Sequence, residues 1–252
     1  MKWTALFIVG LLITVTPLIA QQIPAGTTLP IVLTSSIDAA KAKPGQQITG
    51  KVMQTINLSS GVRIPAGAKV TGHVVGANAA TNSSPARLSF VMDTIRVDDH
   101  PYAVTTNLRA MAGFTQVLDA QTPLTGPDEG VTNADWTTEQ VGGDENVYRD
   151  EGKVEAAGDR VVGSATANGI LAAPETVPGM KCRGDFNHSG DQQAFWIFSS
   201  DACGSYGFDG LQISHAGRTN PVGQIDLASR KDIKLAEGTG LLLRVDGPSQ
   251  RD

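Results

Sequence analysis

The residues best suited to chemistry lie between positions 185 and 191, where oxygen-bearing side chains occupy alternate positions around Gly190. This spacing is typical of the opening of a calcium loop, in which hard oxygen ligands wrap the ion and glycine permits the turn. The twelfth position counted from Asp185 is Trp196, whereas a calcium loop has a bidentate glutamate there. Two interpretations stay open: a weak calcium site completed by atoms elsewhere, or a polar turn. We expect no other cofactor, and the candidate ligands are Asp185, Asn187, Ser189 and Asp191.

No recognisable catalytic motif occurs in the chain, because the nucleophile elbow, the zincin pattern and the phosphate loop are all absent. Residues 203–206 superficially resemble the surroundings of a papain-type nucleophile, but Tyr206 stands where that family has its cysteine. His215 has two interpretations: an acid-base group near Asp209 or Ser205, or a strand-end histidine with one hydrogen bond. We therefore expect a protein that is not an enzyme.

A binding face is the other function that single residues suggest. Aromatic side chains near glycine turns are common in such sites. The candidates are Trp196, Tyr206 and His215. Burial in a hydrophobic core is the alternative for Trp196.

The chain has 2 cysteines, Cys182 and Cys203. In an exported protein a lone pair is more often a crosslink than a metal site, so we expect a disulfide, with two separate thiols as the alternative. Chain entropy alone would make this crosslink worth about 3 kcal/mol.

The N-terminus predicts export. Lys2 precedes an uncharged apolar run over residues 5–15, Pro17 interrupts it, and Ala20 offers a cleavage site. Residues 1–20 are therefore interpreted as a signal peptide, with an uncleaved N-terminal anchor as the alternative and the only expected membrane contact. The protein is expected in the periplasm or at the outer or extracellular surface.

Composition favours a β protein without a nucleic-acid surface. Lys plus Arg total 20 against 25 for Asp plus Glu, a net charge of -5, and no run of cations supplies a phosphate-binding patch. The 28 glycines and 13 prolines suit short strands joined by turns better than long helices.

Residues 23–112 have apolar side chains at alternate positions between turn clusters, which predicts consecutive strands in a barrel-like or sandwich-like domain. Asp98 and Asp99 mark a hairpin turn between two of these strands. A short repeat lies inside this region: residues 23–27 and 64–68 share the order Ile-Pro-Ala-Gly before an alternating run. Residues 235–239 are a weaker third copy, so we expect three turns that each start a strand.

The remainder divides into an acidic segment and a C-terminal β region. Residues 113–179 have many carboxylates and no sustained periodicity of apolar residues, which predicts a long acidic flexible linker or insertion. Short helices, as around residues 154–157, are compatible with this pattern but are not required by it. Residues 180–248 return to strand patterns, including the apolar run 194–198, and contain the expected disulfide. They either pair with residues 23–112 or form a second domain.

Three features follow one another in the N-terminal half: residues 23–27 with Leu33, Pro44-Gly45 with Val52, and residues 64–67 with Gly72. In this order they resemble the TrbI-like family, the envelope-spanning channel components of bacterial conjugation and type IV secretion. The resemblance implies a periplasmic β-barrel scaffold that assembles into a ring. We carry over the barrel-like domain and not the channel activity.

Two functions are consistent with this sequence. The first is an exported, non-enzymatic structural or assembly protein of the cell envelope, whose partner is another envelope protein or further copies of itself. The second is a secreted ligand-binding module, with or without calcium, that uses the disulfide-bonded C-terminal region.

Overall fold

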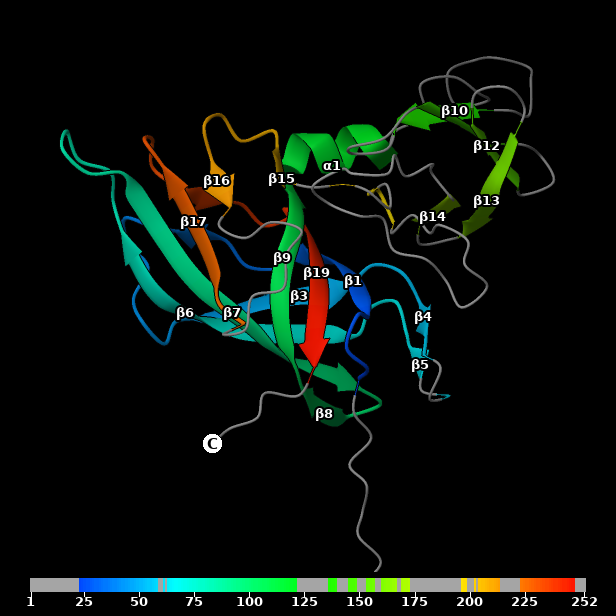
Figure 1. Ribbon diagram of the computed structural model, residues 1–252, viewed down its shortest axis with the longest axis horizontal. Coiled ribbons are helices and arrows are strands. Elements are labelled where there is room, and N and C mark those ends of the chain that lie inside the picture. Colours follow the sequence, from blue (N-terminus) through cyan, green and yellow to red (C-terminus); the bar gives the residue numbers. More distant parts are fainter. Residues whose placement is uncertain are drawn as a thin grey trace, which may run out of the picture.

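This computed structural model describes residues 23–58, 61, 63–121, 136–139, 145–148, 153–156, 160–166, 169–172, 196–198, 202, 204–213 and 223–247. The fold is mainly β, with one short helix (Figure 1).

One large mixed sheet holds most of the strands, in the order β15-β9-β19-β1-β3-β6-β7-β17-β16, with β8 paired to β7. Among the strands that the structure describes, β15 and β9 are the only parallel neighbours. The bounds are β1 Thr28–Leu33, β3 Gln47–Val52, β6 Lys69–Asn78, β7 Ala86–Val97, β8 His100–Ala103, β9 Thr105–Ala112, β15 Gly204–Tyr206, β16 Gln212–Ile213, β17 Ile225–Ser229 and β19 Gly240–Gly247. Two small pairs accompany it: β2 Ile37–Asp38 with β18 Lys234–Leu235, and β4 Ile56–Asn57 with β5 Arg63–Ile64.

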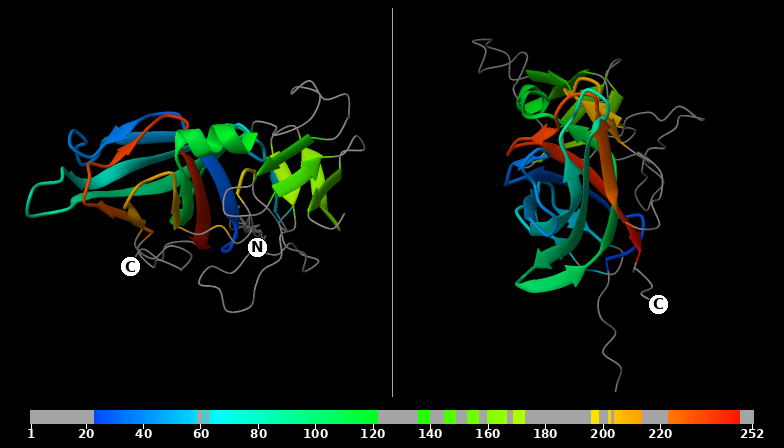
Figure 2. Two further views of the ribbon diagram at one scale, coloured as in Figure 1. Left: turned by 90° about the horizontal axis from the view of Figure 1, so that it is seen from above. Right: turned by 90° about the vertical axis from the view of Figure 1, so that its left-hand side faces the viewer.

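The large sheet is strongly curved, so that β9 and β19 pass in front of β3 (Figures 1 and 2). Its curvature brings the start of β9 back against β7: the Val104 N–H donates to the Asp93 carbonyl at 2.8 Å. The Thr106 hydroxyl likewise donates to the Met92 carbonyl at 2.7 Å. No strand ladder among the described residues closes a barrel, and a sandwich-like fold is consistent with this arrangement.

The hydrophobic core lies on the concave face, where alternate residues of every long strand are buried. A second, smaller core lies on the opposite face, under helix α1 (Phe114–Gln121) and residues 196–198. Its members include Val32, Ala110, Leu242, Val117, Trp196 and Phe198. The sheet segment β9-β19-β1 is therefore covered on both faces.

The repeated turns are confirmed, and each is a type II turn with glycine at the left-handed position. The φ angles of Gly26, Gly67 and Gly238 are 86°, 88° and 88°. In each turn the residue after the glycine donates its N–H to the carbonyl two residues before the glycine, over 3.1–3.3 Å. A fourth turn of this kind lies at Gly45, with φ 81°, and was not identified as a copy of the repeat from the sequence.

We call each type II turn together with its following strand a turn–strand unit; the four units are residues 23–33, 42–52, 64–74 and 235–245. In every unit the glycine N–H donates to a carbonyl in a partner unit, that of the residue seven positions after the partner's glycine. The N–H of that residue donates back to the carbonyl of the residue that follows the first glycine. The glycine bonds join Gly26 to Val245, Gly238 to Leu33, Gly45 to Val74 and Gly67 to Val52, at 2.7–2.9 Å. The units therefore form two reciprocal pairs, β1 with β19 and β3 with β6.

The predicted hairpin at Asp98 and Asp99 is confirmed, with φ angles of 45° and 65° between β7 and β8. The strand order differs from a simple meander, because β19 from the C-terminal region lies between β1 and β9. Strand β17 of the same region pairs with β7. The boundaries proposed for the domains, at residues 112, 179 and 248, stay predictions.

Residues 136–172 lie in the segment predicted as an acidic flexible linker or insertion, and they include a five-stranded sheet in which each strand neighbours the next. The strands are β10 Trp136–Glu139, β11 Glu145–Tyr148, β12 Lys153–Ala156, β13 Arg160–Thr166 and β14 Gly169–Ala172. Their short runs of Thr, Val, Tyr and Ile favour strands despite the surrounding carboxylates.

The expectation of a strand over the apolar run at residues 194–198 was wrong in the part that the structure describes. That part, residues 196–198, is a turn and an isolated bridge in place of a strand, and Trp196 has φ 53°. The Trp196 N–H donates to the Gln54 side-chain carbonyl at 2.5 Å, and the indole meets Phe198 edge to face. Burial of large side chains, without strand pairing, explains the apolar composition here.

Cleavage of the chain between Gly142 and Gly143 tests the pairing across the sequence. We expect a protein cut at an engineered protease site there to elute as one particle under native conditions, because the β1–β19, β9–β19 and β7–β17 ladders join the two fragments. Both cysteines lie in the second fragment, so no disulfide can link the pieces. Native size-exclusion chromatography with fragment masses is the measurement, and separation into two folded fragments would contradict this topology.

Candidate functional site

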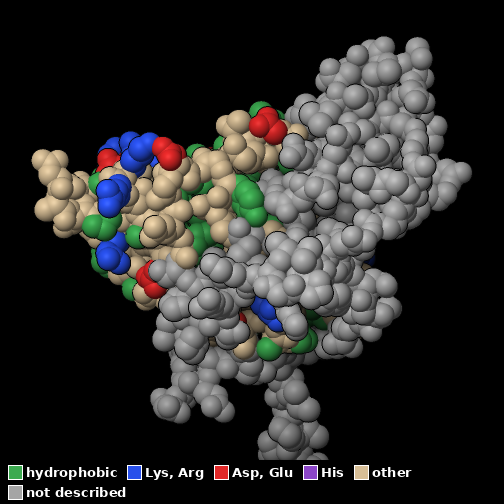
Figure 3. Space-filling view, turned by 45° about the horizontal axis from the view of Figure 1, so that its top comes forward, with side chains coloured by type: hydrophobic (Ala, Val, Ile, Leu, Met, Phe, Trp, Pro, Cys, Tyr) green, Lys and Arg blue, Asp and Glu red, His purple; other side chains and the backbone are tan. Residues whose placement is uncertain are grey.

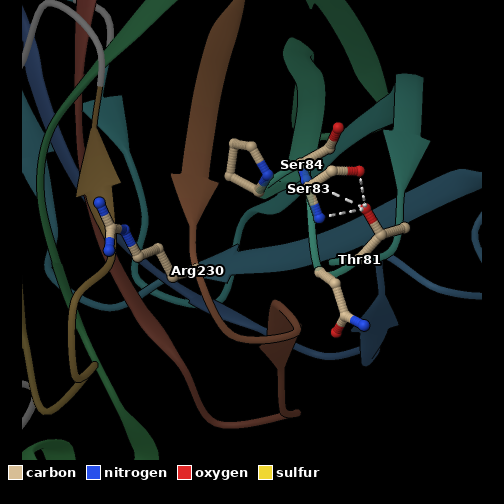
Figure 4. A pocket seen from close by; sticks show the side chains of 6 residues that line it. Thr81, Ser83, Ser84 and Arg230 are labelled. Atoms are coloured by element: carbon tan, nitrogen blue, oxygen red, sulfur yellow. Dashed lines mark hydrogen bonds between the residues drawn. The ribbon is translucent and has the colours of Figure 1, made fainter.

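A hollow of about 690 Å³ lies between the loop that joins β6 to β7 and the turn that follows β17 (Figure 4). One wall is a run of small polar residues and the other is a single arginine. The lining residues are Thr81, Asn82, Ser83, Ser84, Pro85 and Arg230.

The polar loop is held by its own hydrogen bonds. The Thr81 hydroxyl oxygen accepts from the backbone N–H groups of Ser83 and Ser84 at 3.3 and 3.0 Å. The Thr81 N–H donates to the Ser84 carbonyl at 2.8 Å. A bond from the Ala80 N–H to the Asp232 carboxylate, 3.1 Å long, ties this loop to the opposite wall.

Arg230 is placed by the β7–β17 ladder. That ladder pairs Ala86 with Ser229, so Pro85 and Arg230 continue from the paired ends and flank the mouth of the hollow. Figure 4 shows the guanidinium pointing away from the labelled hydroxyls. The lining therefore offers hydrogen bonds and one positive charge that do not converge on a single point.

Charged side chains of both signs surround this end of the molecule (Figure 3). Lys231 donates to the Asp209 carboxylate across the neighbouring surface. That hydrogen bond, together with the positive charge, lowers the pKa of Asp209. Asp209 is thus engaged by Lys231 and ionised at neutral pH, which makes it a poor general acid.

His73 and Asp93 form another pair of titratable groups, on the outer face of β6 and β7. Their Nδ1 and Oδ2 atoms lie 3.2 Å apart, and both side chains are roughly half exposed. The Asp93 Oδ1 also accepts from the Thr94 hydroxyl at 2.8 Å. The Thr94 hydroxyl donates to the carboxylate and not to the His73 imidazole, so the three residues do not form a nucleophile–histidine–carboxylate arrangement, and the pair is a surface interaction.

Of the three residues expected at a binding face, the structure places two at the same core. Trp196 is only 3% exposed and belongs to the second core. Tyr206, in β15, is partly buried and packs against the same core. His215 lies outside the described residues. An exposed face that includes the Trp196 indole is therefore excluded.

The candidate calcium ligands and the two cysteines lie outside the part of the chain that the structure describes. The ligands are Asp185, Asn187, Ser189 and Asp191, and the cysteines are Cys182 and Cys203. Within the described ranges, no three His, Cys, Asp or Glu side chains come together as a metal site would require.

Sequence reasoning missed the hollow. The run Thr-Asn-Ser-Ser-Pro at positions 81–85 is a turn signal that marks the loop between two strands. The sequence does not predict that Arg230 lies beside this loop, because their proximity depends on the pairing of β7 with β17.

No helix in the described part of the chain is long and apolar enough to cross a membrane. No protein-family model matches the chain, and the search of curated proteins also gave no match.

Proposed function

We propose that this chain is an exported, non-enzymatic structural or assembly component of a bacterial cell envelope, with a β domain similar to that of the TrbI-like family. The observation that carries the proposal is the scaffold of four turn–strand units in two reciprocal pairs. Such a scaffold combines short turns with a continuous buried core, which suits a rigid module that holds other proteins in place.

The residues that carry the family resemblance support this proposal. Residues 23–27, Pro44-Gly45 and residues 64–67 are the turns of the first three units, and Leu33 and Val52 accept the reciprocal hydrogen bonds. Turn residues that resemble a family thus have a shared structural task here. The resemblance extends to the scaffold and not to a channel.

Export and the disulfide belong to the same proposal. A signal peptide over residues 1–20 would deliver the chain to an oxidising compartment, where Cys182 and Cys203 would pair. A periplasmic or outer-surface location follows from that route.

The ligand-binding alternative has weaker support. One of its three candidate binding residues, Trp196, is buried. The hollow beside Arg230 is an open depression whose donors do not converge, so it favours a loosely held oxygen-rich ligand at most.

The proposal predicts an exported protein that associates with itself. We expect the full chain, expressed in a Gram-negative bacterium, to be recovered from the periplasmic fraction as a processed chain. Light scattering during size exclusion should give a mass that rises with protein concentration. The protein recovered from the periplasmic fraction is the sample for light scattering, and its mass is measured at low and at high salt. A protein retained in the cytoplasm, or a monomer at every concentration and both salts, would overturn the proposal.

A further inference from the structure

Three cations stand side by side across the outer face of the sheet. The β3–β6 ladder pairs Lys51 with Lys69, and the β6–β7 ladder pairs Lys69 with Arg96. All three side chains are exposed, while their chain neighbours Val52, Val70 and Ile95 are buried in the core. Because neighbours along a strand alternate between faces, the cations share the outer face. We call these three residues the basic row.

The basic row forms no ion pair among the described residues. The Arg96 guanidinium donates to the Asp99 carbonyl, which is neutral, at 2.9 Å. Asp93, on the same strand as Arg96, is already engaged by His73 and Thr94.

Like charges at directly opposed strand positions destabilise a sheet. The fold therefore carries a local electrostatic cost, although the protein as a whole has a net charge of -5. Residues 49, 71 and 94, one row further along the same strands, are all threonine. A row of cations beside a row of hydroxyls is a surface that suits a run of carboxylates.

The chain itself offers such a run. Residues 128–151 contain a single cation, Arg149, and the β10–β11 ladder places Glu139 directly opposite Glu145. The acidic residues are Asp128, Glu129, Asp135, Glu139, Asp144, Glu145, Asp150 and Glu151. Like-charged positions thus face each other in the second sheet too, with the opposite sign.

We propose that the basic row of one copy binds the acidic segment, residues 128–151, of a second copy. Each contact relieves the like-charge repulsion within the basic row and adds attraction between the two copies. The two surfaces differ, so one contact leaves a free basic row on one copy and a free acidic segment on the other. These two either bind each other in a two-fold dimer or continue the assembly into a ring or a filament. This inference rests on the proposed assembly function and names the surfaces that would perform it.

Charge reversal tests the contact. We compare the exported wild-type protein with Lys51→Glu/Lys69→Glu and with Glu139→Lys/Glu145→Lys, by sedimentation equilibrium. We expect each double variant to associate at least about tenfold more weakly than the wild type at low salt, because attraction becomes repulsion. Raising the salt from about 50 mM to about 500 mM should weaken the wild type by a similar factor, through screening. An equimolar mixture of the two variants should associate again, because their reversed charges are complementary.

The control is Lys43→Glu/Arg87→Glu, which makes the same change of charge at two exposed positions outside the basic row. It should associate like the wild type. Equal association of wild type and both reversed variants, insensitivity to salt, or a mixture that stays dissociated would overturn the contact and leave the assembly proposal standing. A wild type that is monomeric at both salts would overturn both. If reversal of the basic row abolishes retention on dextran sulfate and leaves self-association unchanged, the occupant is another polyanion and the proposed contact is wrong.

Discussion

Replacing Gly72 by alanine is expected to destabilise the protein by about 3 kcal/mol, at the upper end of the range for overpacked cores. A Cβ atom at this position would lie 2.8 Å from both the Met92 Cα and the Val91 carbonyl carbon, and closer still to the Val91 oxygen. These are backbone atoms, which cannot rotate away as a side chain does. The β6–β7 ladder shifts register between Thr71 and Gly72, next to this close contact with the backbone of β7. Urea unfolding followed by circular dichroism measures the change.

Gly76→Ala is the matched control, because Gly76 lies in the same strand and has no atom within 4 Å of its added Cβ. Its φ also lies outside the left-handed region. The control should stay within about 0.5 kcal/mol of the wild type or gain slightly, as the unfolded chain loses freedom. Equal midpoints for Gly72→Ala and the wild type would mean that the strands separate at little cost.

The turn–strand units show how far the sequence reaches. Pro and Gly fix turn geometry locally, so the copies at residues 23–27, 64–68 and 235–239 were predictable from their residue types. The unit at Gly45 was not recognised as a copy of the repeat because its proline stands next to the glycine, one position later than in the copies at residues 23–27 and 64–68. The turn needs only glycine at its left-handed position, and that single requirement is too common in sequences to be a signal by itself.

Reciprocal pairing was beyond the sequence. The bonds from Gly26 to Val245 and from Gly238 to Leu33 join residues that are far apart along the chain. Alternation indicates which residues face the core, but it leaves open which strand lies beside which. The placement of β19 between β1 and β9 therefore required the structure.

The candidate site was harder to predict than the fold. The residues favoured by type, such as Trp196, are large and apolar, and the same properties that suit a binding face also drive burial. The basic row contains no motif, because its members are separated in sequence and become neighbours only through two strand registers. Surfaces made by pairing between strands leave no local signal.

A chain that ends after Lys234 is expected not to fold, because it lacks the fourth turn–strand unit. Strand β19 is central, with ladders to β1 on one side and β9 on the other. Its loss removes Leu241, Leu243 and Val245, all at most 1% exposed, from the core. Each such side chain contributes about 2 kcal/mol when buried, against a total stability of about 5–15 kcal/mol for a domain. The removal also leaves the facing edges of β1 and β9 without hydrogen-bond partners. Far-ultraviolet circular dichroism with thermal melting should show no cooperative transition.

A synthetic peptide of residues 235–247 should restore folding to this truncated chain, since the reciprocal bonds of Gly238 with Leu33 and of Val245 with Gly26 can form between separate molecules. The same peptide with Leu243→Asp should fail, because it brings a charge into the core. A chain that ends after residue 247 is the length control and should melt like the full chain. If the chain that ends after Lys234 melts at the same temperature as that control, β19 contributes nothing to the sheet, and the paired scaffold that carries the proposed function is refuted. Restoration by the wild-type peptide alone would instead show that the reciprocal pairing of units drives folding even when the chain does not connect them.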